Sequence, residues 1–343
     1  MPHFGTPDEL ASPVLGGVTR ARAPEVAKLV FVGGTGRSGT HVLSRLIGRH
    51  NRYGLVPVEV RFHTDPDGFP GLLAGEVTPE AFVRRMRGFW WRGFQTRRFR
   101  GMYRFVDRDR YDAAVARFES DHDDLEAACR RLFYDLLWFR IDEGVREGED
   151  NPRGEALVEQ STDTVAAAPT LTRLFPEARF IHVVRDGRDA SASRVAQTRG
   201  IVRPRTRVQG IEWWEERIGA IERAADSIGH GKLLTVSLDE LVRIQRARAA
   251  MRPLFRFLGV PATKRTRRYF SNRMTTAEAN KERWRDGISE RKAARIDELY
   301  RAALDRLEAS GARSVPLLRH SLERSDEDLD PLVYVYDRGP ANE

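Results

Sequence analysis

KLVFVGGTGRSGTHVLSRLI, residues 28–47, is the stretch that decides the fold. Its apolar start, 29–32, is short and rich in β-branched residues, which predicts a buried parallel strand. The glycines that follow predict a tight turn, and the apolar residues of 42–47 have the spacing of one helix face. In a strand, turn and helix of this kind, the free N–H groups of the helix point at the turn. An anion binds best there.

The turn differs from the P-loop of nucleotide hydrolases in the position of its cation. Counted from Gly34, Gly39 and Thr40 fall where that motif ends in Gly-Lys-Ser/Thr, so no lysine stands between glycine and hydroxyl. The cation of this turn is Arg37. A glycine-rich turn that binds nothing is the alternative, but Arg, Ser and Thr together favour an anion site. The candidate ligand-binding residues of the turn are Gly34, Thr35, Gly36, Arg37, Ser38, Gly39 and Thr40.

A second anion site is predicted after another strand. Residues 180–184, FIHVV, form a continuous apolar run, and Arg185 stands at its carboxyl end. Ser193 lies eight residues further on, about two turns into the next helix, so Arg185 and Ser193 can face one anion. Taken alone, the RDGRD cluster at 185–189 would be an ordinary solvated turn.

The remaining pattern predicts an α/β protein with a three-layer P-loop fold around a central parallel sheet. Short apolar runs at 53–56, 156–160 and 232–236 predict further strands, and amphipathic helices separate them. Polar residues that follow such strands lie where open α/β sheets bind ligands, which makes Glu59 and His63 candidate bases.

The whole chain, 1–343, is predicted to form a single domain with three additions. Residues 1–26 are predicted as a flexible arm, and 62–150 as a helical insertion over the cleft. Residues 310–343 are predicted as a C-terminal tail, in part because 323–330 is acidic.

Composition and charge narrow the class of protein. With 41% hydrophobic and 31% charged residues and no apolar run near the ~20 residues of a membrane span, a soluble globular protein is expected. The lone Cys129 excludes an internal disulfide and favours a reducing compartment, so a cytoplasmic location is expected. The net charge of +8 is spread through predicted helices, without zinc-finger spacing or a basic tail, so no nucleic-acid partner is expected.

Together, the two anion sites resemble those of sulfotransferases that use 3′-phosphoadenosine 5′-phosphosulfate (PAPS), especially the bacterial and tyrosylprotein branches. The G-x-x-R-S-G-T turn resembles their 5′-phosphosulfate loop. Residues 157–193 resemble the run in which a Leu-Phe-Pro, an apolar strand and R-D-G-R-D/A precede a serine. The resemblance implies that PAPS is the donor, that Arg37 and its turn hold the phosphosulfate, and that Arg185 and Ser193 hold the 3′-phosphate.

Two further segments carry part of the resemblance. KERWR, 281–285, resembles the basic-tryptophan segment that folds over the donor, which implies Arg283 and Trp284 as donor-binding residues. The alternative is a tryptophan that anchors a loop beside solvated cations. In the run 159–162, EQST, Gln160 stands where many relatives have a lysine, so either catalysis is weaker or another cation, such as Arg61, replaces it.

The base that takes the proton of the acceptor is expected to be Glu59. The Glu-x-Arg pattern at 59–61 resembles the tyrosylprotein branch, where the glutamate is the base, with a one-residue offset. His63 is the runner-up, because an unperturbed histidine pKa near 6.5 suits the role. A solvated surface role for either residue is the third possibility.

The resemblance implies transfer of a sulfonate group from PAPS to a hydroxyl of a carbohydrate, glycolipid or other small molecule, without a metal. The alternatives are sulfation of protein tyrosine, a P-loop small-molecule kinase or nucleotide-binding protein, and a donor-binding protein without turnover. Acceptor recognition is expected within 62–150. The sequence leaves the acceptor and the oligomeric state open.

Overall fold

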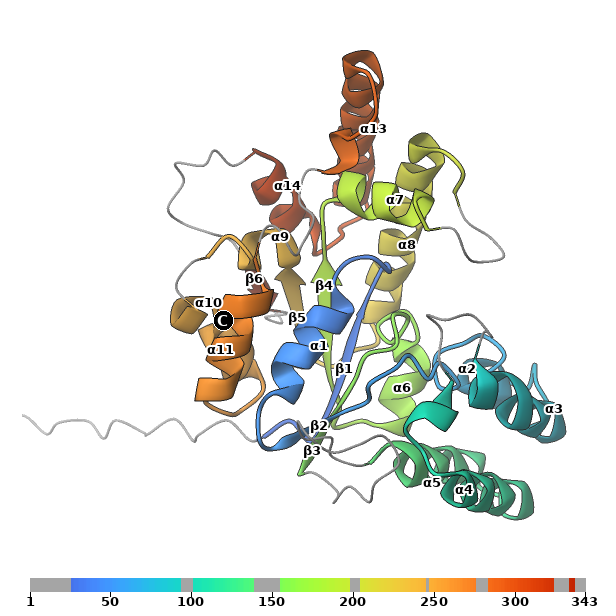
Figure 1. Cartoon of the computed structure of the whole chain (residues 1–343). Helices are drawn as coiled ribbons and strands as arrows, with labels where there is room; N and C mark the ends of the chain where they lie inside the picture. The colour runs from blue at the N-terminus through green and yellow to red at the C-terminus, as the bar shows by residue number, and fades with distance from the viewer. Residues whose placement is uncertain are drawn as a thin grey trace, which may run out of the picture.

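A six-stranded sheet forms the centre of the protein, with strand order β2-β3-β1-β4-β5-β6 (Figure 1). The strands from β1 to β5 are parallel, which places Phe31 of β1 between Glu159 of β3 and Phe180 of β4. The computed structural model describes residues 26–93, 101–138, 155–197, 204–244, 247–275, 283–323 and 333–336. The strands are β1 (Leu29–Gly34), β2 (Tyr53–Leu55), β3 (Ala156–Glu159), β4 (Arg179–Val184), β5 (Leu233–Ser237) and β6 (Tyr334–Tyr336).

Helices cover both faces of the sheet, because its strands are apolar on both sides. Alternation along β1 sends Val30 and Val32 into one core cluster, and Leu29 and Phe31 into another on the opposite face. The α/β fold expected from the sequence is confirmed, with three layers. The helices are α1 (Thr40–Gly48), α2 (Phe69–Leu73), α3 (Pro79–Arg85), α4 (Arg108–Ser120), α5 (Leu125–Leu137), α6 (Ala168–Leu174), α7 (Gly187–Val195), α8 (Arg207–Ala225), α9 (Leu238–Leu241), α10 (Ala247–Phe257), α11 (Lys264–Arg273), α13 (Glu290–Ala309) and α14 (Val315–Glu323).

The core clusters show which helices cover each face of the sheet. Helices α1, α9, α10 and α11 share the cluster of Val30, and α6, α8 and the insertion helices share that of Phe31. In the part of the chain that is described, no helix is long and apolar enough to cross a membrane. The short turns are a π-helix (Met86–Trp90) and two 3₁₀ helices (Met102–Arg104 and Arg283–Arg285).

Part of the predicted tail belongs to the folded core. Strand β6 pairs antiparallel with β5, with Val335 opposite Thr235, and α14 buries Val315 and Leu318. The central sheet is thus parallel except at this edge, and the stretch predicted as a tail, 310–343, contains the folded elements α14 and β6. The outer edge of β5 has backbone groups that need partners, and β6 supplies them. Residues 324–332 and 337–343, and 1–25 of the predicted arm, lie outside the described residues.

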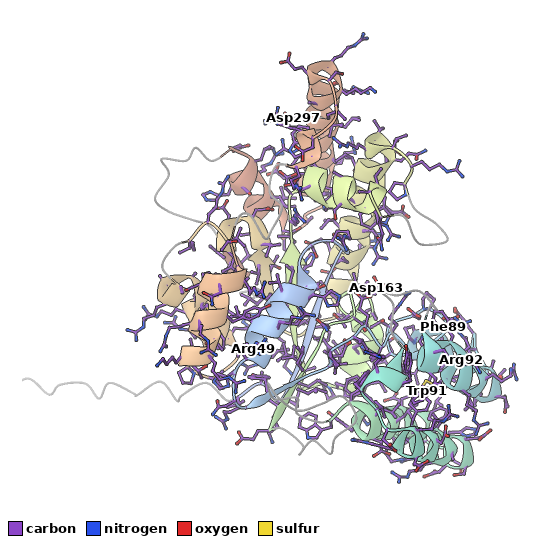
Figure 2. All side chains as sticks on the ribbon, in the orientation of Figure 1. Arg49, Phe89, Trp91, Arg92, Asp163 and Asp297 are labelled. Atoms are coloured by element: carbon purple, nitrogen blue, oxygen red, sulfur yellow. The ribbon has the colours of Figure 1, made fainter. Side chains whose placement is uncertain are left out.

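The predicted insertion is helical and packs beside the sheet on the side of α6 (Figure 1). It contains α2 to α5, and its aromatic residues pack into the core cluster of Phe31, in which Trp90 is 2% exposed and donates its indole N–H to Asp65. Figure 2 shows Phe89, Trp91 and Arg92 among these helices, away from Arg49 on the α1 side. Residues 94–100 and 139–154 of this stretch are outside the described part of the chain.

Candidate active site

The turn between β1 and α1, where the sequence predicts an anion site, is built on unusual backbone conformations. Gly36 (φ 82°), Arg37 (φ 63°) and Gly39 (φ 97°) all have a φ in the left-handed region. The free N–H groups and the dipole of the α1 N-terminus favour an anion at this turn. Gly39 is the N-cap of α1 and has no side chain with which to cap these groups. The predicted strand, turn and helix are confirmed.

The first glycine of the turn is required by close packing. A Cβ atom on Gly34 would lie 2.3 Å from the Ser38 hydroxyl oxygen and 2.5 Å from the Val183 carbonyl oxygen. Ser38 itself is fully buried, and within the described structure its hydroxyl has no hydrogen-bond partner. Ser38 and Gly34 therefore fix the inner wall of the turn.

We expect Gly34→Ala to lower the free energy of unfolding by about 1–3 kcal/mol, the usual cost of overpacking a close-packed site. Chemical denaturation measures this change. The matched control is Gly88→Ala, because a Cβ on Gly88 meets nothing within 4 Å. Equal stabilities of the two variants would contradict the packing argument.

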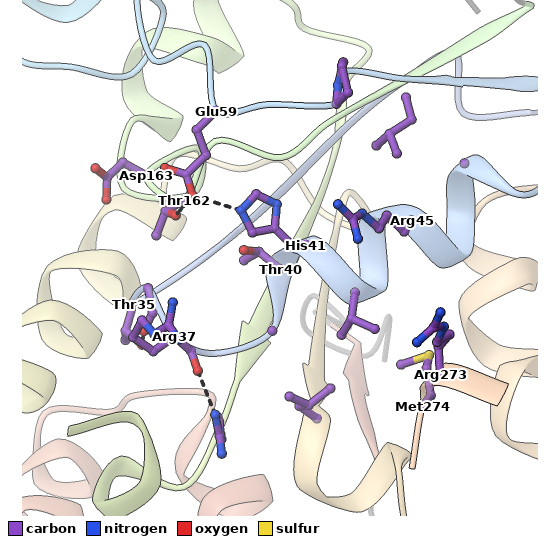
Figure 3. Close-up of a pocket in the computed structure, with 18 of the residues that line it drawn as sticks. Thr35, Arg37, Thr40, His41, Arg45, Glu59, Thr162, Asp163, Arg273 and Met274 are labelled. Carbon is purple, nitrogen blue, oxygen red and sulfur yellow. Dashed lines mark hydrogen bonds and ion pairs between the residues drawn. The ribbon is translucent and has the colours of Figure 1, made fainter. Parts of the chain in front are cut away.

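The two predicted anion sites are joined in the structure through Arg37. The Arg37 Nε donates to the Ser193 hydroxyl at 2.9 Å, and the Arg185 guanidinium donates to the Arg37 carbonyl oxygen at 3.1 Å. Figure 3 marks the bond to the Arg37 carbonyl oxygen as a dashed line. Arg185 is 7% exposed and lies near the Asp189 carboxylate, at 3.9 Å. Residues that are about 150 positions apart in the sequence thus form one cationic cluster at the carboxyl ends of β1 and β4.

Glu59 belongs to a polar network on the other side of the turn. The Thr162 hydroxyl donates to Glu59 Oε1 at 2.9 Å, and His41 Nε2 lies 3.5 Å from the same oxygen. His41 Nδ1 contacts Gln160 Oε1 at 2.7 Å, while the Gln160 amide donates to the Val56 carbonyl oxygen at 2.8 Å. Because the amide nitrogen of Gln160 faces a carbonyl, its oxygen faces His41, and His41 Nδ1 is the donor of that bond.

The network favours the charged forms of both Glu59 and His41. Burial alone would raise the pKa of Glu59, but His41 and the Thr162 hydroxyl lower it below its usual range. The bond to Glu59 raises the pKa of His41 above the usual value of an imidazole, against a smaller opposing effect of burial. The side chains of His41 and Glu59 are 52% and 25% exposed. The Glu59 carboxyl and the His41 imidazole thus lie side by side where a ligand can reach them (Figure 3).

The sequence reasoning missed His41, and the structure does not bring His63 to the same place. His63 is fully buried, with Nε2 2.9 Å from Glu159 and its ring stacked on Phe31. It does not line the cavity that contains Glu59. A side chain without access to ligand is a poor candidate for the base, so of the two predicted candidates only Glu59 has the required placement.

Gln160, which stands where many relatives have a lysine, lies behind the cavity. Gln160 is 0% exposed and is not part of the cavity wall. Its observed contacts hold His41. Arg61, the other cation considered for this position, does line the cavity and forms an ion pair with Asp65 at 2.8 Å.

Arg283 and Trp284 lie close to the second anion site but outside the cavity wall. The Trp284 backbone N–H donates to Asp189 at 3.0 Å, and its ring is 2% exposed and packs on the guanidinium of Arg188 at 4.8 Å. The Arg283 side chain is 66% exposed. The observed placement of Trp284 is that of a loop anchor, which was the alternative interpretation of this segment.

One cavity of about 900 Å³ contains the turn, Glu59, His41 and Arg185. It continues along the exposed side of α1 to α11, and α8 contributes Arg217 to its wall. Between 62 and 138, Thr64 is the single described residue that lines it. The described part of the insertion therefore contributes little to the cavity wall. No group of three or more His, Cys, Asp or Glu that could hold a metal occurs among the described residues.

The fold and the site define a class: an α/β protein in which a glycine-rich turn after a central strand, Arg185 at the end of a second strand, and Glu59 paired with His41 share one cavity. The sequence matches the model of a sulfotransferase family over residues 30–264, which is most of the chain. The chain belongs to the sulfotransferase family.

Solved structures of bacterial sulfotransferases are similar to this chain at low identity. The sulfotransferase domain of the Synechococcus PCC 7002 olefin synthase is 16% identical, with a TM-score of 0.47, over 82% of this chain and 97% of that chain. A sulfotransferase from Alicyclobacillus acidocaldarius is 16% identical, with a TM-score of 0.44, over 86% of this chain and 100% of that one. Sulfotransferase STF9 from Mycobacterium avium is 18% identical, with a TM-score of 0.40, over 82% of this chain and 77% of that chain. No curated protein sequence matches the chain.

Proposed function

We propose that the protein transfers a sulfonate group from PAPS to a hydroxyl of a carbohydrate, glycolipid or other small molecule. The observation that carries this proposal is that Arg37 joins the two predicted anion sites. Its side chain donates a hydrogen bond to Ser193, and its carbonyl oxygen accepts one from Arg185. A donor with phosphate groups at both its 5′ and 3′ positions matches two such sites. Membership of the sulfotransferase family supports the proposal.

The residues of the turn fit the phosphosulfate end of such a donor. The Gly34 Cα position leaves no room for a side chain, and Ser38 holds a buried hydroxyl without a partner in the described structure. Backbone N–H groups of the turn, with the Arg37 guanidinium, would hold the phosphosulfate oxygens. Arg185 and Ser193 would hold the 3′-phosphate.

The same residues are placed to assist sulfonate transfer. The acceptor oxygen attacks sulfur while the bond between sulfur and the bridging oxygen breaks, so negative charge grows on that bridging oxygen. Arg37 and the N–H groups at the start of α1 are preorganised to stabilise this charge. Glu59, held ionised by His41, takes the proton of the acceptor hydroxyl.

We expect isothermal titration to show binding of 3′-phosphoadenosine 5′-phosphate, the product of the donor, and no binding of ADP with Mg²⁺. Arg185→Ala should weaken binding of the bisphosphate about 10- to 100-fold, because loss of a hydrogen bond to a charged group costs about 1.5–3 kcal/mol. Arg173→Ala is the matched control, since Arg173 is exposed on α6 and does not line the cavity.

Each other outcome selects a different function. A preference for ADP, or indifference to Arg185→Ala, would contradict the donor assignment and favour a P-loop kinase or nucleotide-binding protein. Binding of the bisphosphate without turnover of any hydroxyl acceptor would favour a donor-binding protein. Turnover confined to tyrosine peptides would favour the protein-tyrosine sulfotransferase.

A further inference from the structure

Two helices present basic residues to the cavity at the end away from the turn. On α1, Arg45 and Arg49 follow His41 at four-residue intervals, and on α11, Arg265, Tyr269 and Arg273 have the same interval. All six line the cavity. Residues four apart lie on one helix face, so the two rows of side chains face the same space. Figure 3 shows Arg45 and Arg273 at the opposite end of the site from Thr35 and Arg37.

The charge of the cavity wall is much more one-sided than that of the chain. Among the described residues, the wall contains nine arginines and two carboxylates, whereas the whole chain has 58 basic and 50 acidic residues. The two carboxylates, Glu59 and Asp163, form ion pairs with His41 and Arg217. Neither α1 nor α11 contains an acidic residue. A cleft lined with charge of one sign concentrates ligands of the opposite sign.

The proposed donor accounts for only part of this charge. Its anionic groups lie at the turn and at Arg185, both at the N-terminal end of α1, and its adenine ring carries no negative charge. Arg45 and Arg49 are four and eight residues beyond His41, or about 6 and 12 Å along the helix. At that distance they lie beyond the residues assigned to the anionic groups of the donor.

We propose that the acceptor is itself anionic: a hydroxyl compound with a carboxylate or phosphate group about 6–12 Å from the hydroxyl that receives the sulfonate. This inference rests on the proposed function. The hydroxyl lies at Glu59 and His41, and the anionic group lies between the α1 and α11 arginines. Guanidinium groups bind carboxylate and phosphate through paired hydrogen bonds, and the Arg49 guanidinium, over the Tyr269 ring at 5.3 Å, ties α1 to α11 at that point.

The test uses the full chain saturated with 3′-phosphoadenosine 5′-phosphate, and titrates it with maltose, maltobionate and maltose 1-phosphate. These probes share a disaccharide-sized framework and differ in charge and in the type of anion. At least one anionic probe should bind about 10- to 100-fold more tightly than maltose. The double variant Arg45→Gln/Arg273→Gln should lose this preference, while its affinity for the bisphosphate changes by less than about threefold. The control Arg268→Gln removes an exposed arginine of α11 that does not line the cavity.

The outcomes separate this inference from the proposed function. Equal affinity of the wild type for all three probes would overturn the anionic acceptor. So would a loss of bisphosphate binding in the double variant, because the arginines would then serve the donor. Failure of the wild type to bind the bisphosphate at all would instead overturn the proposed function. The type of anion preferred, carboxylate or phosphate, identifies the acceptor class.

Discussion

Arg37→Ala should lower kcat about 10²- to 10³-fold, which corresponds to about 2.7–4 kcal/mol of transition-state stabilisation. Arg37 belongs to the first predicted anion site and contacts both residues of the second, Ser193 through its side chain and Arg185 through its backbone carbonyl oxygen. In the proposed reaction, its charge stabilises the bridging oxygen, which becomes more negative during transfer. Steady-state kinetics with PAPS and an identified acceptor would measure the effect.

A matched variant separates the charge of Arg37 from its backbone. Arg37 has a φ of 63°, which costs a non-glycine residue free energy and glycine almost none. Arg37→Gly should therefore lose as much kcat as Arg37→Ala but unfold at a higher temperature. If kcat stays near the wild-type value and only the KM for the donor rises, Arg37 binds the donor and does not stabilise the transition state.

The sequence predicted the elements whose determinants are local. Strand β1, the turn and α1 need only an apolar run, glycines and helical spacing, all within 28–47, and the structure contains them. Strand β4 follows from its own apolar residues in the same way. The antiparallel β6 was not predicted, because its place at the edge of β5 depends on a partner about 100 residues away.

The base candidates show why neighbours in sequence are not neighbours in space. Glu59 and His63 are four residues apart, but Arg61 between them has a φ of 62° and begins a tight turn that ends the alternation of side chains. His63 consequently enters the core beside Glu159. His41, in contrast, reaches Glu59 from another element and is held by Gln160, 119 residues away. No local pattern identifies such a contact.

The sequence also did not predict that the arginines of α11 line the cavity, for a related reason. Residues 264–273, KRTRRYFSNR, have too many cations for charge to distinguish one helix face from another. Only the packing of Phe270 against the sheet-side core sets the rotation of the helix, and thereby turns Arg265, Tyr269 and Arg273 toward α1. The sequence pattern of a basic helix on the surface therefore does not differ from that of a basic helix that lines a ligand site.

Glu59→Gln should lower kcat about 10²- to 10⁴-fold, the usual contribution of a general base. The amide preserves the bond from Thr162 but cannot take a proton. His63→Gln tests the other candidate: because His63 is buried, this variant should lose stability and keep most of its activity per folded molecule. The opposite pattern, an active Glu59→Gln and an inactive but folded His63→Gln, would make His63 the base.

The pH dependence of kcat/KM tests the pairing of Glu59 with His41. In the proposed reaction Glu59 acts in its ionised form, and its pKa is lowered. As the pH falls, activity should therefore be lost only below the usual glutamate pKa of about 4.3. At alkaline pH Glu59 stays ionised whether or not His41 carries a proton, so this pair predicts an acid limb only. His41→Asn should move the acid limb upward, because Glu59 then loses the group that lowers its pKa. An unchanged profile would mean that His41 lies beside the base without influencing its ionisation.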